Sequence, residues 1–90
     1  MRDSLFRLGD TVVTTNARDQ LDPSDLDRAL KRHASGDWGD LCPEDLKQNE
    51  LALAQGLRLF SVYHARDGSK FWIITEADRS ATTILQPEDY

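Results

Sequence analysis

The spacing of the apolar residues changes near Leu57, and this change limits the folds open to the chain. Before Leu57 the apolar side chains recur with helical spacing, whereas residues 59–64 alternate between two faces. Residues 71–75, Phe-Trp-Ile-Ile-Thr, are the most strongly β-favouring segment. A helical half followed by a β half is typical of an α+β domain. The 90 residues are enough for a single domain with a thin core and few places for an enclosed cavity.

Two helix starts share the same local chemistry. Asp22 can cap free backbone N–H groups ahead of Pro23, and Cys42-Pro43-Glu44-Asp45 repeats the arrangement. Glycine at positions 36 and 56 supplies a residue able to close each helix in the left-handed conformation. The expected helices span residues 23–34 and 43–55.

The second expected helix carries polar residues on or beside its apolar face. On a helical wheel centred on Leu46, Leu53 lies about 20° away, Glu50 about 40° and Asn49 about 60°. A buried carboxylate needs a hydrogen-bonding partner. We therefore expect Glu50 to be at least half buried, and Asn49 and Glu50 to be structural residues that hold neighbouring loops from beneath.

The β half contains a hairpin signal at Arg66-Asp67-Gly68-Ser69. A two-residue Asp67-Gly68 loop would place Val62 opposite Ile73, and a three-residue loop with a bulge at Gly68 would shift the register by one.

A further strand is expected over the β-branched residues 10–15, and another over residues 81–85. The predicted fold for residues 1–90 is one two-layer α+β domain in the order β-α-α-β-β-β. It ends in a three-stranded antiparallel meander and packs both helices on one sheet face.

The formal charge of −5 disfavours general nucleic-acid binding, because the field of the molecule repels phosphate. The acids concentrate in residues 19–50, which contain nine Asp and Glu against four Lys and Arg. These carboxylates are either the solvated faces of helices or an acidic docking surface for a basic partner.

Cysteine and histidine usage gives no sign of a metal or cofactor site. Cys42 is the sole cysteine and cannot form an internal disulfide, and no Cys-x-x-Cys or His-Glu-x-x-His motif occurs. We expect no cofactor, no metal and no catalytic residue. No apolar stretch approaches a membrane span or a signal peptide, so we expect a cytoplasmic protein without membrane contacts.

The loop of residues 35–40, Ser-Gly-Asp-Trp-Gly-Asp, sets one indole between two glycines. Trp38 is either a plug at the edge of the core or, with Asp37, an anchor for a partner.

The turn after the central β segment gathers carboxylates, a guanidinium and hydroxyls within eight residues. These side chains can bind a partner, or the turn can satisfy its own backbone with Arg79 paired to a neighbouring acid. The residues are Glu76, Asp78, Arg79, Ser80, Thr82 and Thr83.

Two stretches carry a resemblance to known sequences. They are residues 35–40 with Asn49-Glu50, and Trp72-Ile73-Ile74-Thr75-Glu76-Ala77-Asp78-Arg79-Ser80 with 82–85 and 87–90. Together they resemble a family of small, acidic, uncharacterised bacterial proteins found on plasmids and other mobile elements, some labelled plasmid-related or restriction-associated. The resemblance implies a bacterial accessory-genome setting and brings no activity, cofactor or site residue.

Three functions remain open from the sequence. The first is a non-enzymatic module, monomeric or homodimeric, that binds an unidentified protein through the Trp38 loop and the 76–83 turn. The second is an inhibitor of a host-defence or other nucleic-acid-handling enzyme by acidic surface mimicry. The third is a small metal-dependent hydrolase or nuclease that uses Glu50, Glu76 and Asp78.

Overall fold

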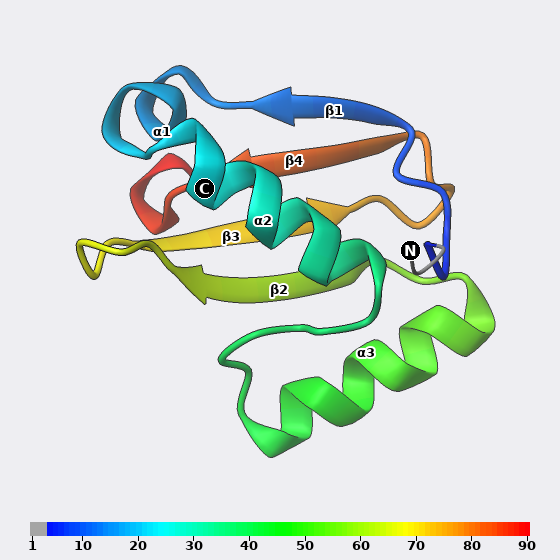
Figure 1. Cartoon of the computed structure of the whole chain (residues 1–90). Coiled ribbons are helices and arrows are strands. Elements are labelled where there is room, and N and C mark those ends of the chain that lie inside the picture. Colours follow the sequence, from blue (N-terminus) through cyan, green and yellow to red (C-terminus); the bar gives the residue numbers. More distant parts are fainter. Residues whose placement is uncertain (1–3) are drawn as a thin grey trace.

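A computed structural model describes residues 4–90 and confirms the α+β class (Figure 1). The elements, in chain order, are β1 (Asp10–Val13), α1 (Thr15–Gln20), α2 (Pro23–Ala34), α3 (Pro43–Gln55), β2 (Leu59–His64), β3 (Lys70–Thr75), β4 (Ala81–Leu85) and the 3-10 helix η1 (Pro87–Asp89).

The sheet is mixed, which corrects the expected arrangement. Its strand order is β1-β4-β3-β2, with antiparallel pairs β2–β3 and β3–β4 and a parallel pair β1–β4. Parallel neighbours need a long crossover, and everything between β1 and β4 supplies it. The predicted three-stranded antiparallel meander is therefore not the whole sheet, because β1 joins β4 and makes four strands.

The second correction is a short helix, α1, in the segment predicted to end a strand. β1 stops at Val13, and Thr14 becomes an N-cap whose Oγ1 accepts a hydrogen bond from the backbone N–H of Ala17 at 3.2 Å. Ala17 is fully buried in the core. Packing of this one alanine and the Thr14 cap outweigh the β preference of Thr15.

The two predicted helices are confirmed over residues 23–34 and 43–55. Asp22 accepts a 2.8 Å hydrogen bond from the Ser24 N–H, and Gly56 closes α3 with φ 69°.

Helix α3 lies along the outer edge of β2 rather than on the sheet face beside α2, as Figure 1 shows. Asn49 explains this position. Its Oδ1 accepts from the Phe60 N–H at 3.1 Å, and its Nδ2 donates to the Phe60 carbonyl. The side chain thus satisfies backbone groups of an edge strand, and Leu46 is left 38% exposed.

The 35–40 loop covers the next part of the same edge of β2. Gly39 forms an isolated parallel bridge with Val62, whose N–H donates to the Trp38 carbonyl at 3.2 Å and whose carbonyl accepts from Asp40 at 2.8 Å. A Cβ on Gly39 would lie 1.9 Å from the Val62 oxygen, so the bridge requires glycine.

The hairpin takes the longer of the two predicted loops. Val62 pairs with Trp72, and Tyr63 pairs with Phe71. Ala65 bonds to Ser69, and Gly68 adopts φ 90°. This is the three-residue loop with the shifted register.

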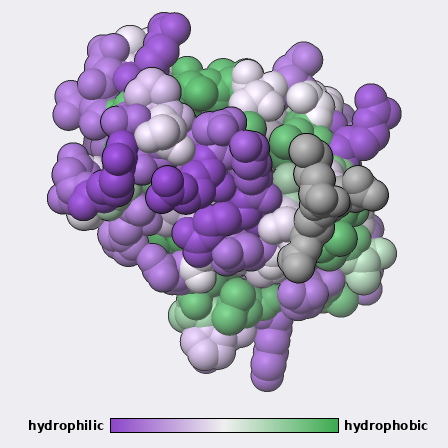
Figure 2. Space-filling view, in the orientation of Figure 1, coloured by the Kyte–Doolittle hydropathy of each residue, from purple (hydrophilic) through white to green (hydrophobic). Residues whose placement is uncertain are grey.

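The sheet has two unlike faces. Alternate residues on one face form the core with α1 and α2, and these include Tyr63, Phe71, Ile73 and Ile84. Figure 2, seen from the helix side, shows hydrophilic residues over α2 and apolar atoms along the lower margin. In Figure 1 the helices α1, α2 and α3 lie in front of the sheet or beside it. On the second face the C-terminal Tyr90 packs against Trp72.

Candidate functional site

Trp38 lies in the core and is 3% exposed. Its ring stacks on Phe6 at 6.1 Å between centroids and meets His33 edge-on at 5.5 Å. Its Nε1 donates to Glu50 Oε1 at 3.3 Å. These contacts match the core-plug alternative and leave no indole surface for a partner.

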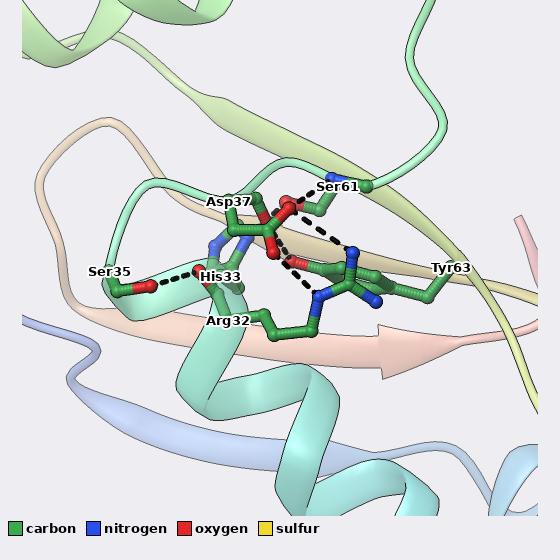
Figure 3. A network of polar contacts seen from close by, with 7 residues as sticks. Arg32, His33, Ser35, Asp37, Ser61 and Tyr63 are labelled. Carbon is green, nitrogen blue, oxygen red and sulfur yellow. Dashed lines mark hydrogen bonds and ion pairs between the residues drawn. The ribbon is translucent and has the colours of Figure 1, made fainter.

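Asp37 holds the loop to α2 and β2 (Figure 3). Its carboxylate accepts from Arg32 Nε at 2.8 Å and Nη2 at 3.2 Å, while its carbonyl accepts from the Tyr63 hydroxyl at 2.6 Å. The hydrogen bond from Arg32 holds the pKa of Asp37 below its ordinary value. Asp37 therefore has a structural role in holding the loop, although half of its side chain remains accessible.

Glu50 is an exposed residue, so it is less buried than expected, but its Oε1 accepts from Trp38 Nε1 and so holds the 35–40 loop as expected. The buried face of α3 is centred on Asn49 and Ala52, because Asn49 fixes the rotation of the helix against β2. Asn49 is a buried structural residue as expected, but its partner is the strand edge instead of a loop.

The Arg79 side chain forms hydrogen bonds to backbone carbonyls. Its Nη1 donates to the carbonyls of Leu57 (2.6 Å), Glu76 (3.1 Å) and Ala77 (3.3 Å), and its Nη2 donates to that of Ala52 at 3.4 Å. Its backbone φ of 60° is rare for a residue with a side chain. The guanidinium thus ties the end of α3 to the β3–β4 turn.

The acids of this turn have other partners. Asp78 accepts from the Ser80 N–H at 3.0 Å, and the hydrogen bonds of Ser80 lower its pKa. Glu76 lies 3.6 Å from Arg58. Asp78 and Ser80 are exposed, and their mutual bond is the self-satisfying turn that was the alternative to a binding site.

The two loops proposed as one interaction site do approach each other, but through Phe6. The ring of Phe6 stacks on Trp38, and the Arg79 guanidinium lies 5.6 Å from its centroid. The N-terminal segment before β1, which sequence analysis left without a role, therefore joins them.

Thr82 is fully buried and belongs to a chain of polar side chains beneath α2. Its hydroxyl donates to the Leu8 carbonyl at 2.7 Å, so the 2.7 Å bond with Thr75 uses the Thr75 proton. Thr75 must then accept from His33 Nε2 at 2.9 Å, and His33 Nδ1 accepts from Ser61 at 2.5 Å. Because each of these hydrogen bonds contains one proton, the His33 imidazole is neutral and is protonated at Nε2.

This buried chain has no access to a substrate. Ser61, His33, Thr75 and Thr82 each have an exposed fraction of 0%. Burial, together with the charge of Arg79, lowers the pKa of His33 to about 4. The Ser61–His33 pair is therefore part of the core and cannot act as a nucleophile and base in this conformation.

The second face of the sheet carries a groove that sequence analysis did not identify. It has a volume of about 240 Å³ and is lined by Arg58, Phe60, Trp72, Ile74 and Tyr90. The Phe60 and Trp72 rings meet edge-on at 5.2 Å, and the Trp72 and Tyr90 rings at 5.7 Å. The walls are therefore three mutually tilted aromatic rings, and Ile74 is buried at 5% exposure.

Arg58 forms the polar rim of this groove. Its Nη1 donates to the Tyr90 hydroxyl at 3.3 Å, its guanidinium lies 5.9 Å from the Tyr90 ring centroid, and Nη2 lies 3.6 Å from Glu76. The Tyr90 bond raises the pKa of Arg58. Half of the Arg58 side chain remains exposed.

The sequence did contain a partial signal for the groove. Residues 58, 60, 72, 74 and 76 alternate with the core residues, which places them on one face. The missing parts were the exact hairpin register and the return of Tyr90 over Trp72, neither of which periodicity specifies.

Residues 4–90 contain no group of three or more His, Cys, Asp or Glu side chains arranged to hold a metal ion. Over the same residues, none of the helices has the length and apolar character required to cross a membrane. Comparison of the chain with protein-family models, curated proteins and solved structures finds no match.

Proposed function

We propose that the chain is a non-enzymatic protein-interaction module that docks a partner on the second face of its sheet. The observation that carries this proposal is the groove of Phe60, Trp72 and Tyr90 with Arg58 at its rim. Tryptophan, tyrosine and arginine are the residue types that dominate binding energy at protein interfaces.

This proposal moves the surface away from the one expected from sequence. Trp38 and Thr82 are buried, and Arg79 is engaged with four carbonyls. Glu76 keeps a place in the surface because it contacts Arg58 at the rim.

The acidic helical half supports mimicry of nucleic acid less well. A phosphate mimic needs carboxylates free to meet a basic partner. In this half several carboxylates already contact a cation: Asp22 and Asp25 with Arg66, Asp27 with Lys31, and Asp37 with Arg32. The carboxylate of Asp40 lies 2.7 Å from His64 Nδ1.

A metal-dependent hydrolase is also less well supported. Its three proposed ligands are engaged separately: Glu50 with Trp38, Glu76 with Arg58 and Asp78 with Ser80.

The test is comparative capture with cross-linking from a lysate of the organism that encodes the chain. Tyr90→Ala and Arg58→Ala remove exposed groove side chains, and Asp27→Ala on α2 is the matched surface control. We expect one protein to be captured by the wild type and the control and lost from both groove variants. Capture that is equal across all four proteins would overturn the proposal.

A further inference from the structure

The aromatic groove has a chemistry that selects one kind of partner segment. Resting on the proposed function, we infer that it binds a peptide in the polyproline II conformation, with a proline in the groove and an acidic residue beside it.

The size of the groove favours one side chain of a larger partner. Pockets that enclose small-molecule ligands usually measure about 300–1,000 Å³. The groove measures about 240 Å³ and is open on the sheet surface. It therefore fits an anchoring residue rather than a whole cofactor or nucleotide.

The backbone around the groove excludes binding by strand addition. β3 is paired on both sides, by β2 and β4. The free side of β2 is occupied by Asn49 at Phe60 and by the 35–40 loop at Val62. A ligand here makes no ladder hydrogen bonds to the sheet, which suits a polyproline II segment, because its backbone stays solvated and proline has no N–H group to satisfy.

The walls suit a proline ring. The Phe60 and Trp72 rings meet at an interplanar angle of 78° and the Trp72 and Tyr90 rings at 68°, and all three rings line the groove. Aromatic grooves of this kind recognise preformed polyproline II peptides at low entropic cost.

The rim specifies the neighbouring residue. Arg58 has five N–H donors, of which one serves the Tyr90 hydroxyl, and its contact with Glu76 is long at 3.6 Å. A carboxylate on the peptide can accept from the remaining donors. A nucleic-acid strand is disfavoured relative to a peptide with one acidic residue, because the strand carries a charge on every nucleotide, whereas the groove has one guanidinium beside Glu76 and the chain carries −5.

The test begins with a display library of random twelve-residue peptides selected on the whole chain. Counter-selection on the Tyr90→Ala variant removes peptides that bind elsewhere. We expect the enriched peptides to contain proline with Asp or Glu one to three positions away. Enrichment of groove-dependent peptides without proline would overturn this inference and leave the proposed function standing, whereas no groove-dependent enrichment would overturn both.

The second step uses the best enriched peptide and its variants in ¹H–¹⁵N NMR titrations. The two indole N–H signals provide an internal control, since Trp72 lines the groove and Trp38 is 3% exposed. We expect only the Trp72 signal to shift. Replacing the acidic peptide residue by Lys should weaken binding about tenfold, and Arg58→Glu should reverse that preference.

Three results would contradict the inference. One is equal affinity for a peptide with its prolines replaced by alanine. Another is unchanged charge preference in Arg58→Glu. The third is tighter binding of a single-stranded oligonucleotide than of the peptide with the same Trp72 shift, which would assign the groove to nucleic acid.

Discussion

The Arg79 guanidinium donates a 2.6 Å hydrogen bond to the carbonyl oxygen of Leu57, the residue that follows the C-cap of α3. Leu57 lies just beyond the helix, and Arg79 reaches its carbonyl from the β3–β4 turn. The same guanidinium also donates to the Ala52 carbonyl within α3 and lies over Phe6. One side chain thus connects α3, the sheet and the N-terminal segment.

We expect Arg79→Ala to lower the free energy of unfolding by about 2 kcal/mol, because it removes charge-assisted bonds to several carbonyls. Arg79→Gly should cost less than Arg79→Ala, since glycine accepts the φ of 60° without strain. Urea unfolding of the three proteins measures both differences. A change below about 0.5 kcal/mol in Arg79→Ala, the range of a neutral surface substitution, would contradict the structural role.

Asn49 should be intolerant even of an isosteric change. Asn49→Asp keeps the acceptor for the Phe60 N–H but loses the donor to the Phe60 carbonyl and places a charge at a site 4% exposed. We expect it to cost at least about 2 kcal/mol and to accelerate amide exchange at Phe60. Gln48→Glu, on the exposed side of the same helix, is the matched control and should be nearly neutral. Equal stability of the two variants would argue against the edge-capping bond.

These contacts explain which parts of the fold were predictable. The helix boundaries at residues 23–34 and 43–55 follow local signals that a sequence shows directly: the Asp22 cap, a proline at the first position of each helix, and Gly56 at the end of α3. Cys42 makes no side-chain cap. The rotation of α3 was predicted incorrectly because the wheel counts leucines, whereas Asn49 sets the rotation through two bonds to a distant strand. Helix α1 was missed because six residues with one buried alanine carry no detectable period.

The candidate site was less predictable than the fold for a similar reason. Polar residues crowded in the 76–83 turn indicated a binding surface, but in three dimensions Arg79 and Thr82 satisfy backbone and core groups. The groove depends on the pairing of Val62 with Trp72 and on Tyr90 returning over Trp72. Both are tertiary facts without a local signature.

Stability should fall on mild acidification because of His33. Its pKa is about 4 when folded against an ordinary 6.5, so between these values the unfolded chain binds a proton that the folded chain excludes. The contribution of neutral His33 to the free energy of unfolding is fully present above pH 6.5 and is lost as the pH falls toward 4. The total loss is about 3 kcal/mol. Urea unfolding at several pH values measures this slope.

Two variants isolate His33 in that experiment. His33→Gln removes the slope between pH 6.5 and 4, whereas His64→Gln, which changes an exposed histidine, preserves it. The carboxylates with lowered pKa values, such as Asp78 and Asp89, begin to lose their contribution only below about pH 5, so the slope between pH 6.5 and 5 is free of them. A slope that persists in His33→Gln would refute the assignment.

The order of protons in the buried chain is directly observable. The bond from Thr82 to the Leu8 carbonyl forces His33 to carry its proton at Nε2. We expect ¹⁵N NMR at pH 7 to show a protonated Nε2 and an unprotonated Nδ1. Thr75→Val should cost about 2 kcal/mol by leaving His33 Nε2 without an acceptor, and Thr75→Ser should retain the bond. A proton on Nδ1 instead of Nε2 would contradict this order of hydrogen bonds.

The last prediction compares two glycines with nearly the same backbone conformation. Gly39 has φ 74° and Gly56 has φ 69°, so an alanine at either position bears a similar left-handed strain of about 1–2 kcal/mol. Their surroundings differ, because a Cβ at position 39 would lie 1.9 Å from the Val62 oxygen whereas nothing lies within 4 Å at position 56.

Gly56→Ala should therefore cost about 1 kcal/mol and leave the fold intact. Gly39→Ala has to displace the 35–40 loop from the edge of β2. This breaks two hydrogen bonds, from the Val62 N–H to the Trp38 carbonyl and from the Asp40 N–H to the Val62 carbonyl. We expect a loss more than twice as large, with faster amide exchange at Val62 and a red-shifted Trp38 emission as the indole leaves the core. Equal costs for the two variants, with Trp38 emission unchanged, would show that the loop does not need close contact with the strand to protect it.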